Sequence, residues 1–563
     1  MPIPNTCPVC GQSYQLRDEM AGKSIRCRCG QAIAAPESAS VFNLLDELPP
    51  ATCAPSSPAA GLTNQQTSYG KRRSAARPPW LIPAAAASAL GVPSLLVIVC
   101  VILFSGRRGE RPAGGMTGGQ LVVPASSEPA SPREDELTRI RAAGEPVSFA
   151  DLDAYYPVPP ADQDATQLWL AGIAPLDSPQ FKASANGLPF VSDGPARIPV
   201  PGNVWPQLAA AETLLMRYRT SLDEIHQAAR RGGRARFPVQ FAAGSNMPLP
   251  HADRLRAASR LLALESAVAA HRGNSDAAVD SIVAMFAADR SIEQEPILVV
   301  QLVRMAMSAM ARGRVEWLLS AAALNDAQLA RLDAELAASD YALPVRRALV
   351  GERVIGIAGF VDPVQTLIGM GMDGQRAGDF PKSAEDEPMY LQIMSEMIAV
   401  FEKTGPARTQ AAQAVDNKLQ QLTSSPGTAR RYPLALLVAP AIGACANAAS
   451  RNEAERDAIR AAVTIERFYG SEGRLPSKID ELSPRFLSSL PIDPCDGQPL
   501  RYRVEPTEYL IYSVGPDGVD DGGRPAAQGQ AGDSVVRVRR GTRKAADRMR
   551  VWAAVNSRSD GDL

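Results

Sequence analysis

Apolar residues recur at helical spacing over most of the chain between residues 134 and 425. Within residues 251–271, Leu255, Ala258 and Leu262 lie three or four positions apart, which places them on one face of a helix. The same pattern occurs at residues 205–231, 275–290, 293–311, 326–339 and 389–403. The pattern therefore predicts an α-helical domain over residues 134–430.

Two polar sequences predict where individual helices end and begin. Gly273-Asn274-Ser275-Asp276 combines a helix stop with an N-cap, so residues 251–271 and 275–290 are predicted to form a helical hairpin. Asn325-Asp326-Ala327-Gln328 has the pattern of a capping box. Stacked hairpins of this size are typical of a tetratricopeptide-type solenoid, but without a fixed-period repeat an irregular helical bundle fits equally well. Either architecture offers a surface for binding a peptide or a protein.

Residues 80–104 show a different pattern, because the whole segment is uncharged and mostly apolar. A segment of this length and composition can cross the hydrocarbon core of a bilayer, and Pro93 is expected to kink it. The flanking residues 37–79 and 105–133 are rich in small residues and proline, which is typical of flexible linkers. We therefore predict a single transmembrane helix.

Polar and apolar residues alternate near the C-terminus. The apolar positions Leu500, Tyr502 and Val504 are followed, after a turn, by Tyr509 and Ile511, and this period of two predicts a β-hairpin. A long helix with an apolar stripe is predicted before it, over residues 434–468, and a further apolar run follows at residues 535–538. Together these elements predict an α+β domain over residues 431–541, followed by a basic tail over residues 542–563.

An acidic, glycine-rich segment follows the hairpin directly: Asp517-Gly518-Val519-Asp520-Asp521-Gly522-Gly523. Calcium takes six to eight oxygen ligands, and glycines allow the backbone to curl so that several oxygens converge. The order of acids and glycines does not fit an EF-hand. The segment predicts either a calcium loop or a solvated turn rich in aspartate and glycine.

The segment from residue 456 to residue 536 resembles the globular domain of the major pseudopilin of type II secretion systems. The resemblance rests on Leu475-Pro476, Pro491-Ile492-Asp493-Pro494, residues 496–502, residues 512–518 (YSVGPDG), and Gly532-Asp533. It implies a long helix, a small antiparallel sheet and a calcium loop. Asp517 matches the first calcium ligand of the family, and Asp533 matches the acidic residue before the last strand.

Two features separate this chain from that family. Asp520 and Asp521 stand where family members more often carry other residues, so they are candidate calcium ligands on chemical grounds alone. The short basic leader and adjoining apolar helix of the family are also not found at this N-terminus. The resemblance therefore predicts a domain fold and not a pilus subunit.

Four of the eight cysteines cluster near the N-terminus, as Cys7, Cys10, Cys27 and Cys29. Two close cysteine pairs, each followed by glycine, are typical of a zinc ribbon in which four thiolates hold the metal. The second pair is C-x-C where the usual spacing is C-x-x-C. We predict a zinc ribbon over residues 1–36. Cys445 and Cys495 belong to the C-terminal domain, where they are either a disulfide or two separate thiols.

Composition and motifs argue against nucleic-acid binding and against several classes of enzyme. Lys and Arg total 59 against 60 Asp and Glu, so no overall positive charge favours nucleic acid. His226 lies on one predicted helix, and His251 and His271 lie at the two ends of another. All three are expected to be surface or capping residues, and neither a nucleophile elbow nor a P-loop occurs. The composition and motifs therefore favour a binding protein over an enzyme.

Together these features predict a multi-domain protein anchored in the cytoplasmic membrane by one helix. Basic residues are slightly more frequent before residues 80–104 than after them, which favours a cytoplasmic N-terminus. Thiolate zinc ligands suit a reducing compartment, and a calcium loop suits the opposite side. The predicted function is non-enzymatic protein interaction or envelope assembly, with a place beside a type II secretion system as one option. The alternatives are an envelope hydrolase with its site in the helical domain and a transmembrane sensor that signals to the zinc ribbon.

Overall fold

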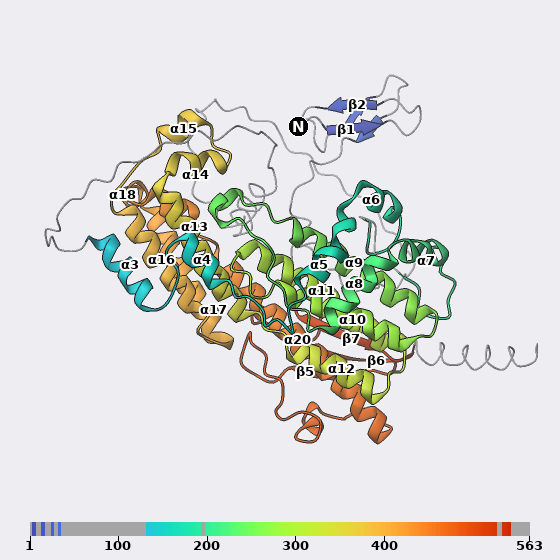
Figure 1. The fold of residues 1–563 in the computed structure, drawn as a ribbon. Coiled ribbons are helices and arrows are strands. Elements are labelled where there is room, and N and C mark those ends of the chain that lie inside the picture. Colours follow the sequence, from blue (N-terminus) through green and yellow to red (C-terminus); the bar gives the residue numbers. More distant parts are fainter. Residues whose placement is uncertain are drawn as a thin grey trace, which may run out of the picture.

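The computed structural model describes four short strands within the first 34 residues, and then residues 131–192, 198–525 and 532–541. The predicted linkers, the predicted transmembrane helix at residues 80–104, the four clustered cysteines and the tail after residue 541 lie outside these ranges. The described chain is mostly helical and includes a small three-stranded sheet (Figure 1).

The N-terminal strands form two antiparallel hairpins. Strand β1 (Ile3–Thr6) pairs with β2 (Ser13–Leu16), and β3 (Ser24–Arg26) pairs with β4 (Ala32–Ala34). In the sequence, each hairpin therefore spans one of the two cysteine pairs.

Helices make up most of the chain after residue 131. The first half contains α3 (Pro132–Ala142), α4 (Phe149–Tyr155), α5 (Thr166–Ile173), α6 (Pro179–Ala185), α7 (Leu208–Arg217), α8 (Arg219–Arg230), α9 (Pro250–His271), α10 (Ser275–Ser291) and α11 (Leu298–Ala321). The second half contains α12 (Asp326–Ala337), α13 (Ala342–Val361), α14 (Pro363–Gly369), α15 (Gly374–Gly378), α16 (Asp386–Val400), α17 (Gly405–Ser424), α18 (Pro426–Arg431), α19 (Pro433–Val438) and α20 (Ile442–Glu472). Short 3₁₀ turns lie at Ala174–Asp177, Phe241–Asn246 and Ile479–Leu482.

The predicted helical hairpin and the predicted caps are confirmed. Helices α9 and α10 pack on each other across a turn in which Gly273 has a φ of 76° and the Asn274 side chain accepts a hydrogen bond from Ala277 N. Asn325 and Gln328 form the capping box at the start of α12. These local signals are sufficient because each cap is satisfied within a few residues of sequence.

Three predicted helices have different bounds in the structure. The helix predicted at residues 205–231 breaks at Tyr218, whose ring packs edge-on against Phe181 with centroids 5.0 Å apart. Helix α11 begins at Leu298 and not at residue 293, because the Gln301 side chain donates to three carbonyls of the preceding turn. The predicted helix at residues 434–468 divides into α19 and α20 around Pro440, which has no N–H for a helical hydrogen bond.

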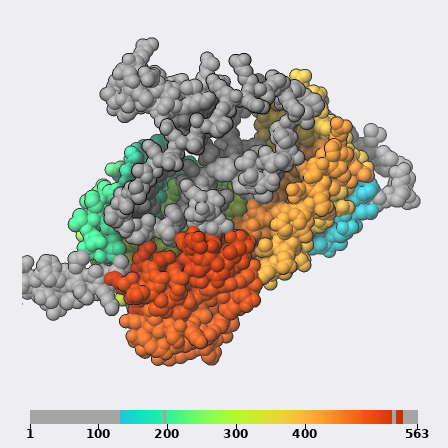
Figure 2. Space-filling model, turned by 180° about the vertical axis from the view of Figure 1, so that it is seen from behind, coloured from blue at the N-terminus to red at the C-terminus, as the bar shows by residue number. Residues whose placement is uncertain are grey.

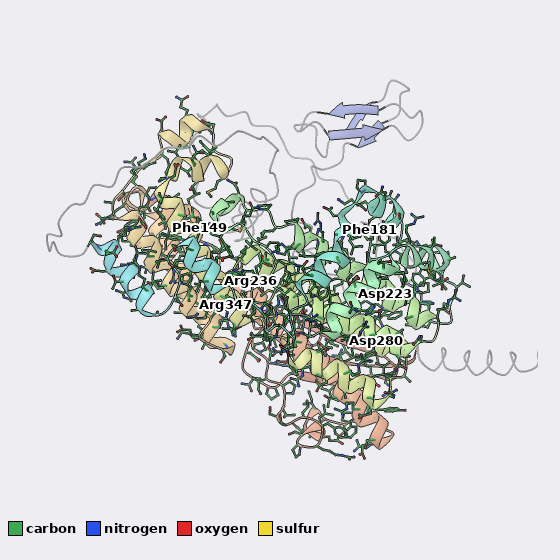
Figure 3. The ribbon with its side chains drawn as sticks, viewed as in Figure 1. Phe149, Phe181, Asp223, Arg236, Asp280 and Arg347 are labelled. Atoms are coloured by element: carbon green, nitrogen blue, oxygen red, sulfur yellow. The ribbon has the colours of Figure 1, made fainter. Side chains whose placement is uncertain are left out.

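Half-buried arginines and aromatic rings hold α4 against the rest of the helical region. Arg236 donates to Asp153 and to Tyr156 O, and its guanidinium lies over the Tyr156 ring. Arg347 from α13 lies over the ring of Tyr155. Figure 3 labels both arginines beside α4, so α4 is held by residues that are distant in sequence.

The C-terminal sheet is antiparallel and has the strand order β5 (Arg501–Val504), β6 (Glu508–Ser513), β7 (Ser534–Arg539). The predicted hairpin is therefore confirmed, and the apolar run at residues 535–538 lies in β7. The sheet packs on α20, and Tyr509 Oη donates to Ala462 O on that helix. Figure 2 shows these red and orange residues directly against the yellow-orange helices.

One hydrophobic core joins the helical region to the sheet. The same cluster of buried side chains contains Leu262 of α9, Val315 of α11, Ile459 of α20, Tyr509 of β6 and Val538 of β7. A second cluster joins α13, α16 and α17 to the first half of α20. Because both clusters include α20, this helix connects the two parts of the fold.

Helix α11 also covers one edge of the sheet. Arg537 N donates to Glu316 Oε1 and Arg539 N donates to Ser320 Oγ, both at 3.0 Å. An uncovered edge strand offers its N–H groups to other chains, and these two side chains occupy that position on β7. The opposite edge, β5, carries Arg501 and Arg503, whose charges oppose strand addition.

We predict that Glu316 makes the stability of this edge depend on pH. Burial raises the pKa of Glu316 to about 7, although the Arg537 N–H and nearby arginines oppose the shift. A raised pKa means that the folded state binds the proton more tightly, so stability falls as pH rises from about 5 to about 7. In Glu316→Gln, the free energy of unfolding is expected to fall by roughly 2 kcal/mol less over this pH range than in the wild type. Urea unfolding at pH 5 and pH 8 measures it, and an equal decrease in the variant would contradict the assignment.

One segment of the described chain is long and apolar enough to cross a membrane, judged by length and composition. It runs from Pro433 to Glu472 through α19 and α20. In this fold Ile442, Cys445 and Ala446 of that segment are buried against α16 and α17. The segment is therefore a core helix in this structure.

Carboxylates from neighbouring helices cap the starts of α19 and α20. Asp386 of α16 accepts hydrogen bonds from Leu434 N and Ala435 N, both at 2.9 Å. Asp416 of α17 lies so close to Gly443 that a Cβ there would be 2.1 Å from its Oδ2 atom. Carboxylates in these positions satisfy N–H groups that have no partner within the helix.

Candidate functional sites

The four aspartates predicted to bind calcium lie on the long connection between β6 and β7. Asp517 and Asp520 are exposed, Asp521 is half-buried and Asp533 is buried. Asp533 accepts hydrogen bonds from Asp521 N at 3.2 Å and from Gly523 N at 2.6 Å. Its carboxylate therefore closes the loop by binding backbone N–H groups.

The other loop carboxylates also have protein partners. Asp517 Oδ1 accepts from Val519 N and Asp520 Oδ1 accepts from Gly522 N, as in Asx turns. Asp521 forms an ion pair with Arg524 at 3.2 Å. No group of three Asp, Glu, His or Cys side chains converges as metal ligands among the residues that the structure describes. Calcium binding by this loop stays a prediction.

Asp493 organises the base of the same loop and was quoted in the sequence only as part of a resemblance. Its Oδ1 accepts from Cys495 N and Ser513 Oγ, and its Oδ2 accepts from Val514 N and Arg501 Nη1, at 2.8–3.1 Å. Asp493 is fully buried. This one carboxylate therefore connects the segment before β5 to the end of β6.

The carboxylates also affect each other. Burial raises the pKa of Asp533, and the charges of Asp520 and Asp521 raise it further, while the two backbone N–H groups lower it. The nearby Arg501 guanidinium holds the pKa of Asp496 below its usual range. Arg501 lies 3.6 Å from Asp520 as well, so it compensates part of the negative charge of the loop.

A buried polar network in the helical region has no counterpart in the sequence predictions. Arg312 of α11 donates to Ser308 Oγ, Tyr341 Oη, Asn452 Oδ1 and Glu455 Oε2 at 2.6–3.0 Å. It therefore links α11 to the start of α13 and to α20. The available signal was a charged residue on the apolar face of a predicted helix, which predicts burial but not the partner.

Arg304 extends this network by two turns of α11. Its Nε lies 3.3 Å from Asp289 Oδ1, and its Nη2 donates to Asp340 O. Neither carboxylate oxygen of Asp289 has a hydrogen-bond partner, and burial raises the pKa of this group to about 6. A buried network of this kind connects helices specifically, although it contributes little to net stability.

The three histidines lie apart and contact different groups. His251 is buried, so the expectation of a surface or capping residue is wrong for it; its Nε2 lies 2.9 Å from Glu295 Oε2 and its ring stacks on Phe237. His226 Nε2 lies 2.7 Å from Glu265, which also accepts from Ser281 Oγ at 2.8 Å. In this second cluster the carboxylate lies between the histidine and the serine, so the histidine cannot act as the base for that hydroxyl.

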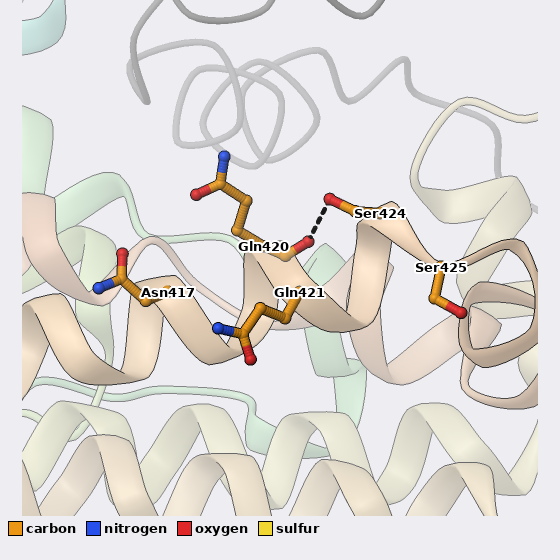
Figure 4. A pocket seen from close by; sticks show the side chains of 5 residues that line it. All are labelled: Asn417, Gln420, Gln421, Ser424 and Ser425. Carbon is orange, nitrogen blue, oxygen red and sulfur yellow. Dashed lines mark hydrogen bonds between the residues drawn. The ribbon is translucent and has the colours of Figure 1, made fainter.

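Two open grooves lie on the surface of the described chain. One, of about 490 Å³, is lined by Asn417, Gln420, Gln421, Ser424 and Ser425 of α17 and its end (Figure 4). The other, of about 370 Å³, lies between α20 and residues 487–492, and its two arginines, Arg456 and Arg460, are paired with Asp457 and Asp333. Uncharged amides and paired ions suit surface contacts more than acid–base chemistry.

Cys445 and Cys495 of the C-terminal region are not joined by a disulfide in this structure. Cys445 is buried in α20 and Cys495 is half-buried near Asp493. The interpretation as two separate thiols therefore applies here. Burial raises the pKa of Cys495 to about 11, which keeps it in the unreactive thiol form near neutral pH.

No protein-family model, curated protein or solved structure matches this chain.

Proposed function

We propose that this chain is anchored in the cytoplasmic membrane and binds other proteins of the cell envelope, with no catalytic role. The supporting observation is the shared core, in which α11 and α20 contact both the helical region and the sheet. A protein that presents binding surfaces benefits from such rigidity, because less freedom is lost when a partner binds. The residues 80–104 would anchor it, with the N-terminal cysteines in the cytoplasm and residues 131–541 outside.

The covered edge of the sheet supports this proposal over a filament subunit. Glu316 and Ser320 accept hydrogen bonds from the outward N–H groups of β7, and β5 carries two arginines at the other edge. Neither edge is therefore suited to adding a strand from another chain. In this proposal the pseudopilin-like segment is a stable module within a larger binding domain.

The proposal also includes a zinc ribbon at the N-terminus, and zinc content tests it. Full-length protein is expected to carry about one zinc ion per chain, and Cys27→Ser is expected to lose it because three thiolates do not complete a tetrahedral structural site. Cys53→Ser, in a predicted linker, is the control and should keep the metal. Elemental analysis of the purified proteins measures this, and equal zinc content in both variants would contradict the ribbon.

The interaction function is tested by photo-crosslinking in intact cells. A photoreactive side chain at Val361, which is 79% exposed, or at Val504, on the other part of the fold, should join the full-length chain to envelope proteins. The buried Leu262 is the control position and should give none. Secretion-system components among the products would identify the role, and exposed positions that crosslink no protein would contradict the proposal.

A further inference from the structure

Arg314 of α11 is a buried cation without a counter-charge among the residues that the structure describes. Arg314 is only 4% exposed, and its Nε and Nη2 atoms have no hydrogen-bond partner. Burial is the cause that lowers its pKa, to about 9, and no carboxylate of the described chain forms an ion pair with it. At neutral pH the guanidinium keeps its charge, because even the lowered pKa is well above 7.

Arg312, two residues earlier on the same helix, shows how this fold treats a compensated arginine. It is buried to a similar extent, but its two terminal nitrogens have four partners, including the carboxylate of Glu455. The Nε atom of Arg312 also has no hydrogen-bond partner, so Arg314 differs from Arg312 at Nη2 and in having no ion pair with a described carboxylate. A buried charge without a partner is strongly unfavourable, so a function is a reasonable explanation for its presence.

The unpartnered nitrogens are the two that bind an anion best. Nε–H and Nη2–H point in parallel from one side of the guanidinium, and a carboxylate or phosphate accepts both at once. Aromatic rings cover the guanidinium, with its carbon 4.1 Å from the Trp317 ring centroid and 5.0 Å from that of Phe190. The rings fix the orientation of the guanidinium but supply no negative charge.

The charge of Arg314 also acts on a neighbouring histidine. His271, whose Nε2 lies 2.6 Å from Pro199 O, has its pKa lowered by burial and further by the charges of Arg314 and Arg272. Phe190 has a φ of 68°, the only positive φ of a non-glycine residue in the described ranges. Backbone strain of this kind often accompanies binding sites, and here it lies on the residue that covers Arg314.

We propose that Arg314 is the centre of an anion-binding site that takes the carboxylate or phosphate group of a ligand. The anion would accept from Nε and Nη2 and would replace the missing counter-charge, while Trp317 and Phe190 line the site. Entry of the ligand requires Phe190 to move, because both nitrogens are buried. The site does not depend on the proposed interaction function.

Thermal unfolding of the full-length protein in detergent tests the site with inorganic phosphate and with acetate, each against chloride at equal ionic strength. At least one of the two anions is expected to raise the melting temperature by about 2 °C or more, because it binds only the folded state. Phosphate alone would indicate a phosphorylated ligand, and acetate alone a carboxylate. Equal melting temperatures in all three salts would overturn the proposal.

Arg314→Met keeps the volume and removes the charge, and Arg312→Met is the matched control on the same helix. Without added anion, Arg314→Met is expected to melt at or above the wild-type temperature and to lose the response to anions. Arg312→Met is expected to melt lower and to keep that response. Arg314→Lys, which keeps the charge but not the paired donors, should show a weakened response. An Arg314→Met variant that responds like wild type would overturn the proposal.

Discussion

Replacing Asp493 with alanine is expected to lower the free energy of unfolding by about 3–5 kcal/mol. The carboxylate is fully buried and accepts from two backbone N–H groups, the Ser513 hydroxyl and Arg501. Alanine leaves the two backbone N–H groups and the Ser513 hydroxyl without this acceptor inside the protein, while Arg501 keeps Asp496. The donors lie before β5, at its start and at the end of β6. We therefore expect the base of the acidic loop to lose its order too.

Urea unfolding of the full-length protein measures this effect, with Asp496→Ala as the matched control. Asp496 also pairs with Arg501 but is half-buried, so its loss should cost about 1 kcal/mol or less. Asp493→Asn keeps acceptor oxygen at one position and should fall between the two. If Asp493→Ala and Asp496→Ala are equally stable, Asp493 does not organise the loop.

Arg312→Met is expected to lower the free energy of unfolding by about 3–5 kcal/mol. The methionine fills most of the volume, but it leaves the carboxylate of Glu455 and the polar groups of Asn452 and Tyr341 without their donor. These partners lie on α13 and α20. The variant should therefore loosen the packing of α20 against the helical region, and amide exchange in α20 should become faster.

The matched control for this prediction is Arg331→Met, which removes an exposed ion pair with Asp280. Exposed pairs contribute roughly 0–1 kcal/mol, so this variant should unfold close to wild type. Urea unfolding followed by circular dichroism compares the two. A small effect of Arg312→Met would mean that the cost of burying its charge offsets the four hydrogen bonds.

The sequence predicted the elements whose causes are local. The cap at Asn274, the capping box at Asn325 and the alternation from Leu500 to Ile511 each depend on residues a few positions apart, and the structure has all three. The predicted ends of helices were wrong where a contact with a residue distant in sequence interrupts the helix. Tyr218 leaves the helix to pack on Phe181, and no pattern around Tyr218 contains that information.

The candidate sites follow the same division. Asp533 and the acidic loop were found from composition and resemblance, because acids and glycines cluster in sequence. Asp493, Arg312 and Arg314 were not, because each looks like an ordinary charged residue until its neighbours are known. Arg312 and Arg314 lie two residues apart on one helix. Within the described chain, the terminal nitrogens of Arg312 have four hydrogen-bond partners, whereas Nε and Nη2 of Arg314 have none.

The sequence by itself therefore determined those helices, caps and strands that capping and periodicity mark, since these signals act over one or two turns of chain. Helices α13 and α17 were not predicted individually. Only the tertiary structure decided how the sheet and the helical region combine. Arg312 meets Asn452 across 140 residues of sequence, and Glu316 meets Arg537 across 221. Such pairs form because folding buries both partners in one place and each must then satisfy the other's charge or hydrogen bond, which neither local sequence specifies.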